Sequence, residues 1–242
     1  KQITSLLWGV GMVEKRKLRK VGEAPGVWKL FHAATKPRRI HHNTPMKLSG
    51  PAAGSDLVKT AADPKGVDCL GTFNNCGAGR TPWGTYLTCE ENFNGYFGTT
   101  DAAFKLPDDY KRYGIVAETR YAYEKFDARF DVAKNPNEPR RAGYVVEIDP
   151  SDASSTPIKR TALGRIKHEN AAVVIARDGR VVVYMGDDER GEFLYKFVSN
   201  GIYVPGGDTS KLLDEGTLYV ARFSDDGAGE WLALTPETTG MK

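Results

Sequence analysis

The chain has 242 residues, of which 40% are hydrophobic and 27% are charged, and its formal net charge is +3. This length and composition are ordinary for a globular protein with a sizeable core. The small net charge gives no argument for a nucleic-acid or membrane-surface partner, and no apolar run approaches the roughly 18–20 residues of a membrane-spanning helix. Because the first residue is Lys1 rather than Met, we expect a processed or trimmed piece of a longer protein.

The apolar runs are short and strand-like along the whole chain, with turn residues between them. GTYLTC (84–89), YVVEID (144–149) and FLYKFV (193–198) read as single strands. Two hairpins are predicted, one over residues 171–186 around an Asp-Gly turn and one over residues 218–234. Helical periodicity is weak everywhere, and the best helix candidate lies within Thr119 to Phe130. These patterns predict an all-β fold.

A looser repeat is present beneath this pattern. One unit runs NNCGAG, GTYLTCEEN, GYVVEIDP and KRTALGR, and the next runs KHENAA, RVVVYMGDDERG, EFLYKFVS and LYVARF. Both units read as four strands with an acidic cluster after the second, which is typical of the blades of a β-propeller. The first seventy residues, with GVWKLF and RRIHH, would add one or two blades at most. We therefore expect residues 1–242 to form a single β-propeller domain that is truncated at one or both ends.

Blade geometry predicts where the polar residues of these units meet. The start of the innermost strand and the turn after the second strand lie on one face of an up-and-down blade. This places a set of polar residues near one end of the central channel: Asn74, Asn75, Cys89, Glu90, His168, Glu169, Arg190 and Glu192. Clustered carboxylates repel one another unless a cation lies among them, so a metal site is predicted there.

The string Cys89-Glu90-Glu91-Asn92 offers both a soft thiolate and hard oxygen ligands. The simpler interpretation of Cys89 is a buried small hydrophobic residue, and that of Glu169 or Glu192 is a strand-end carboxylate. Arg190 presents a planar fork of donors that matches a phosphate, although a local ion pair with a neighbouring aspartate is the alternative.

Three cysteines cannot all pair with one another. Cys69 and Cys76 could form a short-loop disulfide in an oxidising compartment, which would leave Cys89 as an odd thiol. The spacings between the three residues fit no common zinc pattern.

The motifs GTFNNCGAGRTPWGTYLTCEENFNGYF, NEPRRAGYVVEIDP, KRTALGRIKHENA and YMGDDERGEFLYKFV together resemble the PhoX-type alkaline phosphatases. The resemblance extends over roughly residues 44–234. It implies a six-bladed propeller that is monomeric when complete, exported by the twin-arginine route to the periplasm or the cell exterior. It also implies hydrolysis of small phosphate monoesters for phosphate scavenging, with Fe³⁺ and Ca²⁺ as cofactors and no nucleic-acid or membrane partner.

On this resemblance, four residues match metal ligands of the family: Cys89, Glu90, Glu169 and Glu192. Arg190 matches a phosphate-binding and catalytic arginine, and Asn74 and Asn75 match positions near the substrate phosphate. The family's later segment, with an acidic residue and an arginine that complete the site, has no counterpart before Lys242. Such a piece is expected to bind metal poorly and to catalyse weakly.

Two other functions remain open on the sequence. A noncatalytic propeller that serves as a binding module would keep the strand pattern and bind no iron. A calcium-dependent propeller lactonase or esterase would have no use for the cysteine or for a phosphate-binding arginine.

Overall fold

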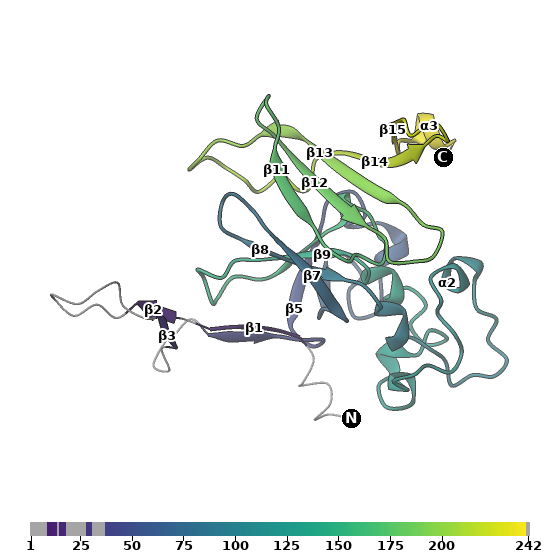
Figure 1. The fold of residues 1–242 in the computed structure, drawn as a ribbon. Helices are drawn as coiled ribbons and strands as arrows, with labels where there is room; N and C mark the ends of the chain where they lie inside the picture. Colours follow the sequence, from purple (N-terminus) through teal and green to yellow (C-terminus); the bar gives the residue numbers. More distant parts are fainter. Residues whose placement is uncertain (1–8, 14, 18–27, 31–36, 241–242) are drawn as a thin grey trace.

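The computed structural model describes residues 9–13, 15–17, 28–30 and 37–240. Within these residues the protein is an all-β structure, and its main part consists of two sheets that pack against each other (Figure 1). Each sheet contains one of the four-strand units that the sequence predicted. The fold is that of a partial propeller, as expected.

The first sheet has six strands in the order β6-β5-β10-β9-β8-β7. All neighbours are antiparallel except β10 and β5, which run parallel. The sheet therefore contains the predicted four-strand unit, β7 to β10, extended by two earlier strands. Its strands are β5 (Pro45–Ser49), β6 (Asp68–Leu70), β7 (Asn75–Arg80), β8 (Tyr86–Glu90), β9 (Val145–Ile148) and β10 (Ile158–Arg160).

The second sheet has five strands in sequence order, and all of its neighbours are antiparallel. Both predicted hairpins are confirmed, because β11 turns into β12 and β14 turns into β15. The strands are β11 (Ala172–Ile175), β12 (Arg180–Gly186), β13 (Leu194–Ile202), β14 (Gly216–Phe223) and β15 (Gly229–Ala233).

The first seventy residues add no further blade among the residues that the structure describes. They contribute β5 and β6 to the first sheet and two small antiparallel pairs, β1 with β4 and β2 with β3. The four short strands of these pairs are β1 (Val10–Met12), β2 (Lys15–Lys17), β3 (Trp28–Leu30) and β4 (Arg38–Ile40).

Among the described residues, helical structure is confined to 3₁₀ turns and to two α-helices of 5 and 4 residues. The predicted helix within Thr119 to Phe130 was wrong, because that segment forms two 3₁₀ turns with an Asp127 cap between them. Its aromatic residues pack into a local core rather than along one face of a helix. The turns are η1 (Asp56–Val58), η2 (Phe93–Tyr96), α2 (Asp108–Arg112), η3 (Tyr123–Lys125), η4 (Ala128–Phe130), η5 (Glu138–Arg141), η6 (Thr161–Leu163) and α3 (Pro236–Thr239). No helix of the described residues is long and apolar enough to cross a membrane.

Three hydrophobic clusters hold these parts together. The first lies between the two sheets and joins Leu87 and Val145 to Val183 and Phe197. The second is aromatic and fills the long excursion between β8 and β9, which carries α2 on the right of Figure 1. The third backs the first sheet on its other side, around Ile40 and Ile148. The first cluster fixes the two sheets relative to each other and hence fixes the residues at their junction.

A fully buried ion pair joins Lys159 of β10 to Glu90 at the end of β8, with Nζ 2.8 Å from Oε1. Oε1 also accepts a hydrogen bond from the backbone N–H of Phe73, and Oε2 accepts from those of Gly143 and Tyr144. The Lys159 ammonium donates a second hydrogen bond to the carbonyl of Arg141. Because every charge is compensated, this pair can be held in the core.

We predict that Lys159→Met destabilises the protein by about 3–5 kcal/mol, because it leaves the Glu90 carboxylate buried without a cation. The double variant Lys159→Met/Glu90→Gln should recover part of this lost stability, because the buried charge is removed as well. Lys47→Met is the control, since Lys47 pairs with Asp68 at the surface and such pairs contribute about 1 kcal/mol or less. Urea unfolding measures all three variants, and equal losses for Lys159→Met and Lys47→Met would contradict the prediction.

Candidate metal centre

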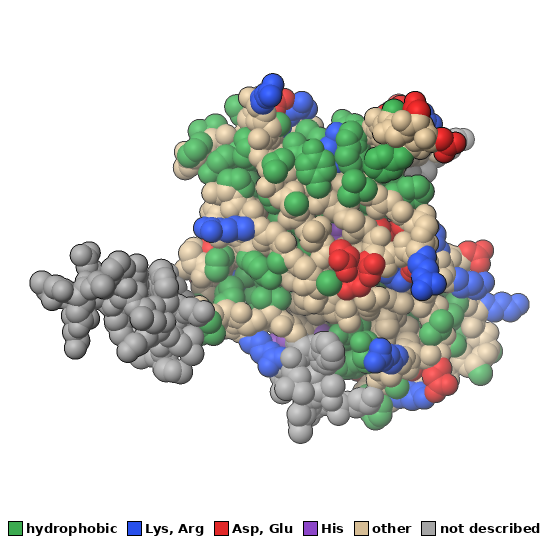
Figure 2. Space-filling model, in the orientation of Figure 1, with side chains coloured by type: hydrophobic (Ala, Val, Ile, Leu, Met, Phe, Trp, Pro, Cys, Tyr) green, Lys and Arg blue, Asp and Glu red, His purple; other side chains and the backbone are tan. Residues whose placement is uncertain are grey.

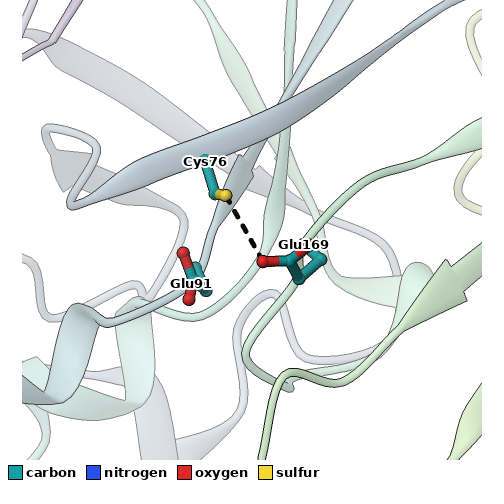
Figure 3. Close-up of side chains that lie close together, drawn as sticks. All are labelled: Cys76, Glu91 and Glu169. Atoms are coloured by element: carbon teal, nitrogen blue, oxygen red, sulfur yellow. Dashed lines mark hydrogen bonds between the residues drawn. The ribbon is translucent and has the colours of Figure 1, made fainter.

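Three potential metal ligands converge where the two sheets meet. Cys76 lies in β7, Glu91 follows β8 and Glu169 precedes β11, and their ligand atoms all lie within 4.8 Å of one another (Figure 3). The Cys76 thiol donates to Oε1 of Glu169 across 3.6 Å. The space-filling view shows acidic side chains gathered on this face at the junction of the sheets (Figure 2). The donors therefore come from both sheets.

Two glycines of β7 allow the sheets to approach this closely. The Gly77 N–H donates to the carbonyl of Glu169 at 2.7 Å, and a Cβ on Gly77 would lie 2.2 Å from that oxygen. A Cβ on Gly79 would lie 1.9 Å from the carbonyl oxygen of Ala171. Neither glycine has a positive φ, so both are required for space rather than for backbone conformation. The close approach places Glu169 beside Cys76.

The anchored Glu90 sets the position of Glu91. The carbonyl of Glu90 accepts the N–H of His168, and the N–H of Glu91 donates to the carbonyl of Asn74 at 3.2 Å. Since successive residues of an extended chain point to opposite sides, burying Glu90 on one side directs Glu91 to the other. Glu91 is itself buried, and Asn92 donates to its carboxylate at 2.6 Å.

The electrostatics of the cluster favour a bound cation. Burial raises the pKa of Glu91, and the nearby carboxyl of Asp188 raises it further. Desolvation together with the carboxylates of Glu91 and Glu169 raises the pKa of Cys76 to about 11. Desolvation and nearby acidic groups thus both disfavour the charged forms of Glu91 and Cys76, and a bound metal ion would favour those charged forms. A thiolate with several carboxylates fits a transition metal such as iron, with oxygen ligands left for a harder cation.

Cys89 and Glu90, two of the expected ligands, have structural contacts instead. Cys89 is fully buried in the hydrophobic cluster between the sheets, and burial raises the pKa of its thiol to about 12. Both carboxylate oxygens of Glu90 are used by Lys159 and the backbone. Neither residue belongs to the group of converging ligand atoms. Their role as ligands stays a prediction, whereas Glu169 does lie in the group.

The other expected residues do not belong to this group of ligand atoms. Glu192 forms a bidentate ion pair with Arg112. The Arg190 side chain is exposed, and the described residues give its guanidinium no ion pair with the neighbouring aspartates. Asn74 adopts a left-handed conformation, with φ 45°, and the amide of Asn75 donates to the Thr72 hydroxyl at 2.6 Å.

His168 is buried beneath this region. Its Nε2 contacts the carbonyl oxygen of Gly164 at 3.0 Å, and Nδ1 has no hydrogen-bond partner among the described residues. Burial lowers the pKa of His168 to about 4, which keeps the ring neutral at physiological pH. The ring therefore adds no positive charge to the carboxylate cluster.

Cys76 and Asp188 lie at the candidate site but were not expected there from the sequence. The signal for Cys76 was present, because it directly follows Asn75 at the start of the innermost strand of the blade, where ligands were expected. It also lies opposite the Cys89–Glu90 segment across the β7–β8 ladder, at a bulge. Asp188 belongs to the same acidic run as Arg190 and Glu192.

A sequence model of the family described as alkaline phosphatase PhoX matches residues 12–242. Among solved structures, the chain is similar to that described as Pseudomonas fluorescens PhoX in complex with vanadate, a transition state analogue, with 53% sequence identity and a TM-score of 0.87. The similarity covers 94% of this chain and 40% of that chain, so this chain spans about two fifths of the length of that relative. No curated protein matches the chain.

We predict that Gly77→Ala separates Glu169 from Cys76, because the added methyl group cannot coexist with the Glu169 carbonyl. The pKa of Cys76 should fall toward its ordinary value, and Co²⁺ affinity should fall by about tenfold or more. The pH dependence of alkylation of this exposed thiol measures the first effect, and a Co²⁺ titration measures the second. Gly11→Ala is the control, since its Cβ would meet nothing within 4 Å. Unchanged values in Gly77→Ala would contradict the close-approach argument.

Proposed function

The chain belongs to the PhoX alkaline phosphatase family, and from this membership we propose that it contributes to a metal-dependent phosphatase site for small phosphate monoesters. The observation that carries the proposal is the convergence of Cys76, Glu91 and Glu169 at the junction of the two sheets. Since the chain spans two fifths of its relative's length, the activity of a complete enzyme is part of the proposal.

Cys76, Glu91 and Glu169 would hold Fe³⁺, with Asp188 available to the same ion or to Ca²⁺. When bound, such cations neutralise phosphate oxygens and stabilise the charge that develops in the transition state. Cys89, Glu90 and Glu192 remain candidate ligands from the family resemblance, although their described contacts favour structural roles.

The protein's own groups would bind and orient the phosphate. Arg190 is exposed at the loop that carries Asp188, where its guanidinium can turn toward a bound phosphate and donate two hydrogen bonds. Asn74 and Asn75 lie immediately before Cys76 and are candidate phosphate-binding residues from the family resemblance, although the Asn75 amide already donates to the Thr72 hydroxyl. Lys159 is fully buried and paired with Glu90, so it takes no part in substrate binding.

The compartment is also a proposal, and it rests on the family alone. Export by the twin-arginine route would place the protein in the periplasm or outside the cell. Fractionation of the producing bacterium tests this, and recovery in the cytoplasmic fraction alone would exclude it.

The cysteine variants distinguish the two thiol assignments. We expect Cys76→Ser to lower iron content and hydrolysis of a chromogenic phosphate monoester by about a hundredfold, because it removes a ligand rather than an outer contact. Cys89→Ser should retain iron. The control is Cys69→Ser, which should also retain iron because Cys69 lies in the hydrophobic cluster on the other side of the first sheet. Metal content by mass spectrometry and initial rates are the measurements. Loss of iron in Cys89→Ser with retention in Cys76→Ser would restore the original assignment.

The wild-type chain provides the test of the function itself. Iron with calcium, vanadate binding and hydrolysis of the phosphate ester would support the phosphatase. Absence of metal and turnover would favour a noncatalytic module or a scaffold whose site needs further residues to assemble. Cleavage of lactones without phosphate esters would favour a calcium-dependent esterase.

Metal binding should strengthen as the pH rises through the neutral range. The raised pKa of Cys76 means that the free thiol is protonated there, and the metal must displace this proton. Release of one proton corresponds to about a tenfold gain in apparent affinity per pH unit. Titrations with Co²⁺ at several pH values measure the slope. Cys76→Ser should reduce it, and an unchanged slope in that variant would show that the thiol is not the group that loses the proton.

A further inference from the structure

A bidentate ion pair links the excursion between β8 and β9 to the acidic loop between β12 and β13. Arg112 Nη1 lies 2.8 Å from Oε1 of Glu192, and Nη2 donates to Oε2 at 2.9 Å. The pairing uses both oxygens of the carboxylate and both terminal nitrogens of the guanidinium, which fixes the orientation of each group. Glu192 is largely buried, with 13% of its side chain exposed.

Arg112 is presented by a well-held turn. It is the last residue of α2, whose Tyr110 is fully buried in the aromatic cluster. Arg140 pairs with Asp109 of the same turn at 2.9 Å, and the Tyr113 hydroxyl donates to the carbonyl of Arg165 at 2.8 Å. The guanidinium therefore approaches Glu192 from a fixed base, which reduces the entropy that pairing costs.

The acidic loop is held on its other side as well. Lys167 pairs with Glu189, and the carbonyl of Lys167 accepts the N–H of Asp188 at 3.0 Å. Within the loop, the N–H of Glu192 donates to the carbonyl of Glu189 at 3.1 Å. Asp188 thus belongs to a loop that two ion pairs hold, Lys167–Glu189 and Arg112–Glu192, and its carboxyl lies beside Glu91.

We propose that Arg112 is a positioning residue that holds the acidic loop so that Asp188 meets Glu91 at the metal centre. Its partner is Glu192, so Glu192 acts through this contact rather than as a ligand. The effect of Arg112 on metal binding rests on the proposed metal site. The bracing of the loop is independent of that site.

The test uses Arg112→Gln, which keeps a polar side chain but removes the charge and the fork. Because 55% of the Arg112 side chain is exposed, water can replace part of the lost contact to the largely buried Glu192, and the melting temperature should fall less than in Lys159→Met. Amide hydrogen exchange over residues 186–194 should accelerate. Co²⁺ affinity, followed by the thiolate–cobalt absorption band, should fall by about tenfold.

Matched variants separate positioning from a general effect of charge. Arg222→Gln removes another exposed Arg–Glu contact, with Glu230 on the β14–β15 hairpin, and should change neither readout. Arg112→Lys should rescue only part of the affinity, because a lysine cannot form the fork. The double variant Arg112→Gln/Glu192→Gln should be no weaker than Arg112→Gln alone if the two residues act as one unit.

The outcomes distinguish this inference from the proposed function. Unchanged exchange in Arg112→Gln would overturn the inference, whatever the metal does. Faster exchange with unchanged Co²⁺ affinity would also overturn it, since the loop would then be irrelevant to the centre. If the wild-type chain gives no thiolate–cobalt band, the proposed metal site fails, and hydrogen exchange still decides whether Arg112 holds the loop.

Discussion

The buried Lys159–Glu90 pair is the interaction on which the arrangement of the site depends. Both side chains have no exposed surface, and four hydrogen bonds to Glu90 come from three segments that are far apart in the sequence. Removing two charges from water is costly, and the cost is offset only when all partners are in place. The end of β8 is therefore fixed as one unit with β10 and with residues 141–144, and Glu91 leaves that unit in a defined direction.

A second constraint acts between the sheets. Gly77 and Gly79 remove the side chains that would keep β7 away from residues 169–171, and the hydrophobic cluster behind them holds the sheets at that spacing. Cys76 and Glu169 come from different sheets, so they meet only when both sheets are folded and packed. Metal binding at this junction is consequently coupled to the packing of the two sheets, as is general for sites that do not exist in the unfolded chain.

Local patterns were enough to predict the blades, and they were insufficient for the site. The Asp-Gly turn and the β-branched runs around it predict the β11–β12 hairpin, because both signals are contained in a few residues. Which cysteine is the candidate metal ligand, Cys76 or Cys89, depends on which of the two side chains points into the core. The bulge in the β7–β8 ladder affects this orientation, and it is not visible in the sequence. Likewise, Lys159 is 69 residues from Glu90, so no local signal shows that this glutamate is already paired. Arg112 was missed for the same reason, since it reaches Glu192 from an excursion with weak periodicity.

The pairing of carboxylates separates structural groups from candidate ligands. Among the described residues, five buried or half-buried glutamates meet a lysine or arginine: Glu90 with Lys159, Glu138 with Arg141, Glu147 with Arg160, Glu189 with Lys167 and Glu192 with Arg112. Glu91, Glu169 and Asp188 have no such ion pair in the described part of the chain, and they are the ones that gather around Cys76. A cation from outside the chain would complete the charge balance of the junction, which is the physical reason for proposing a metal centre there.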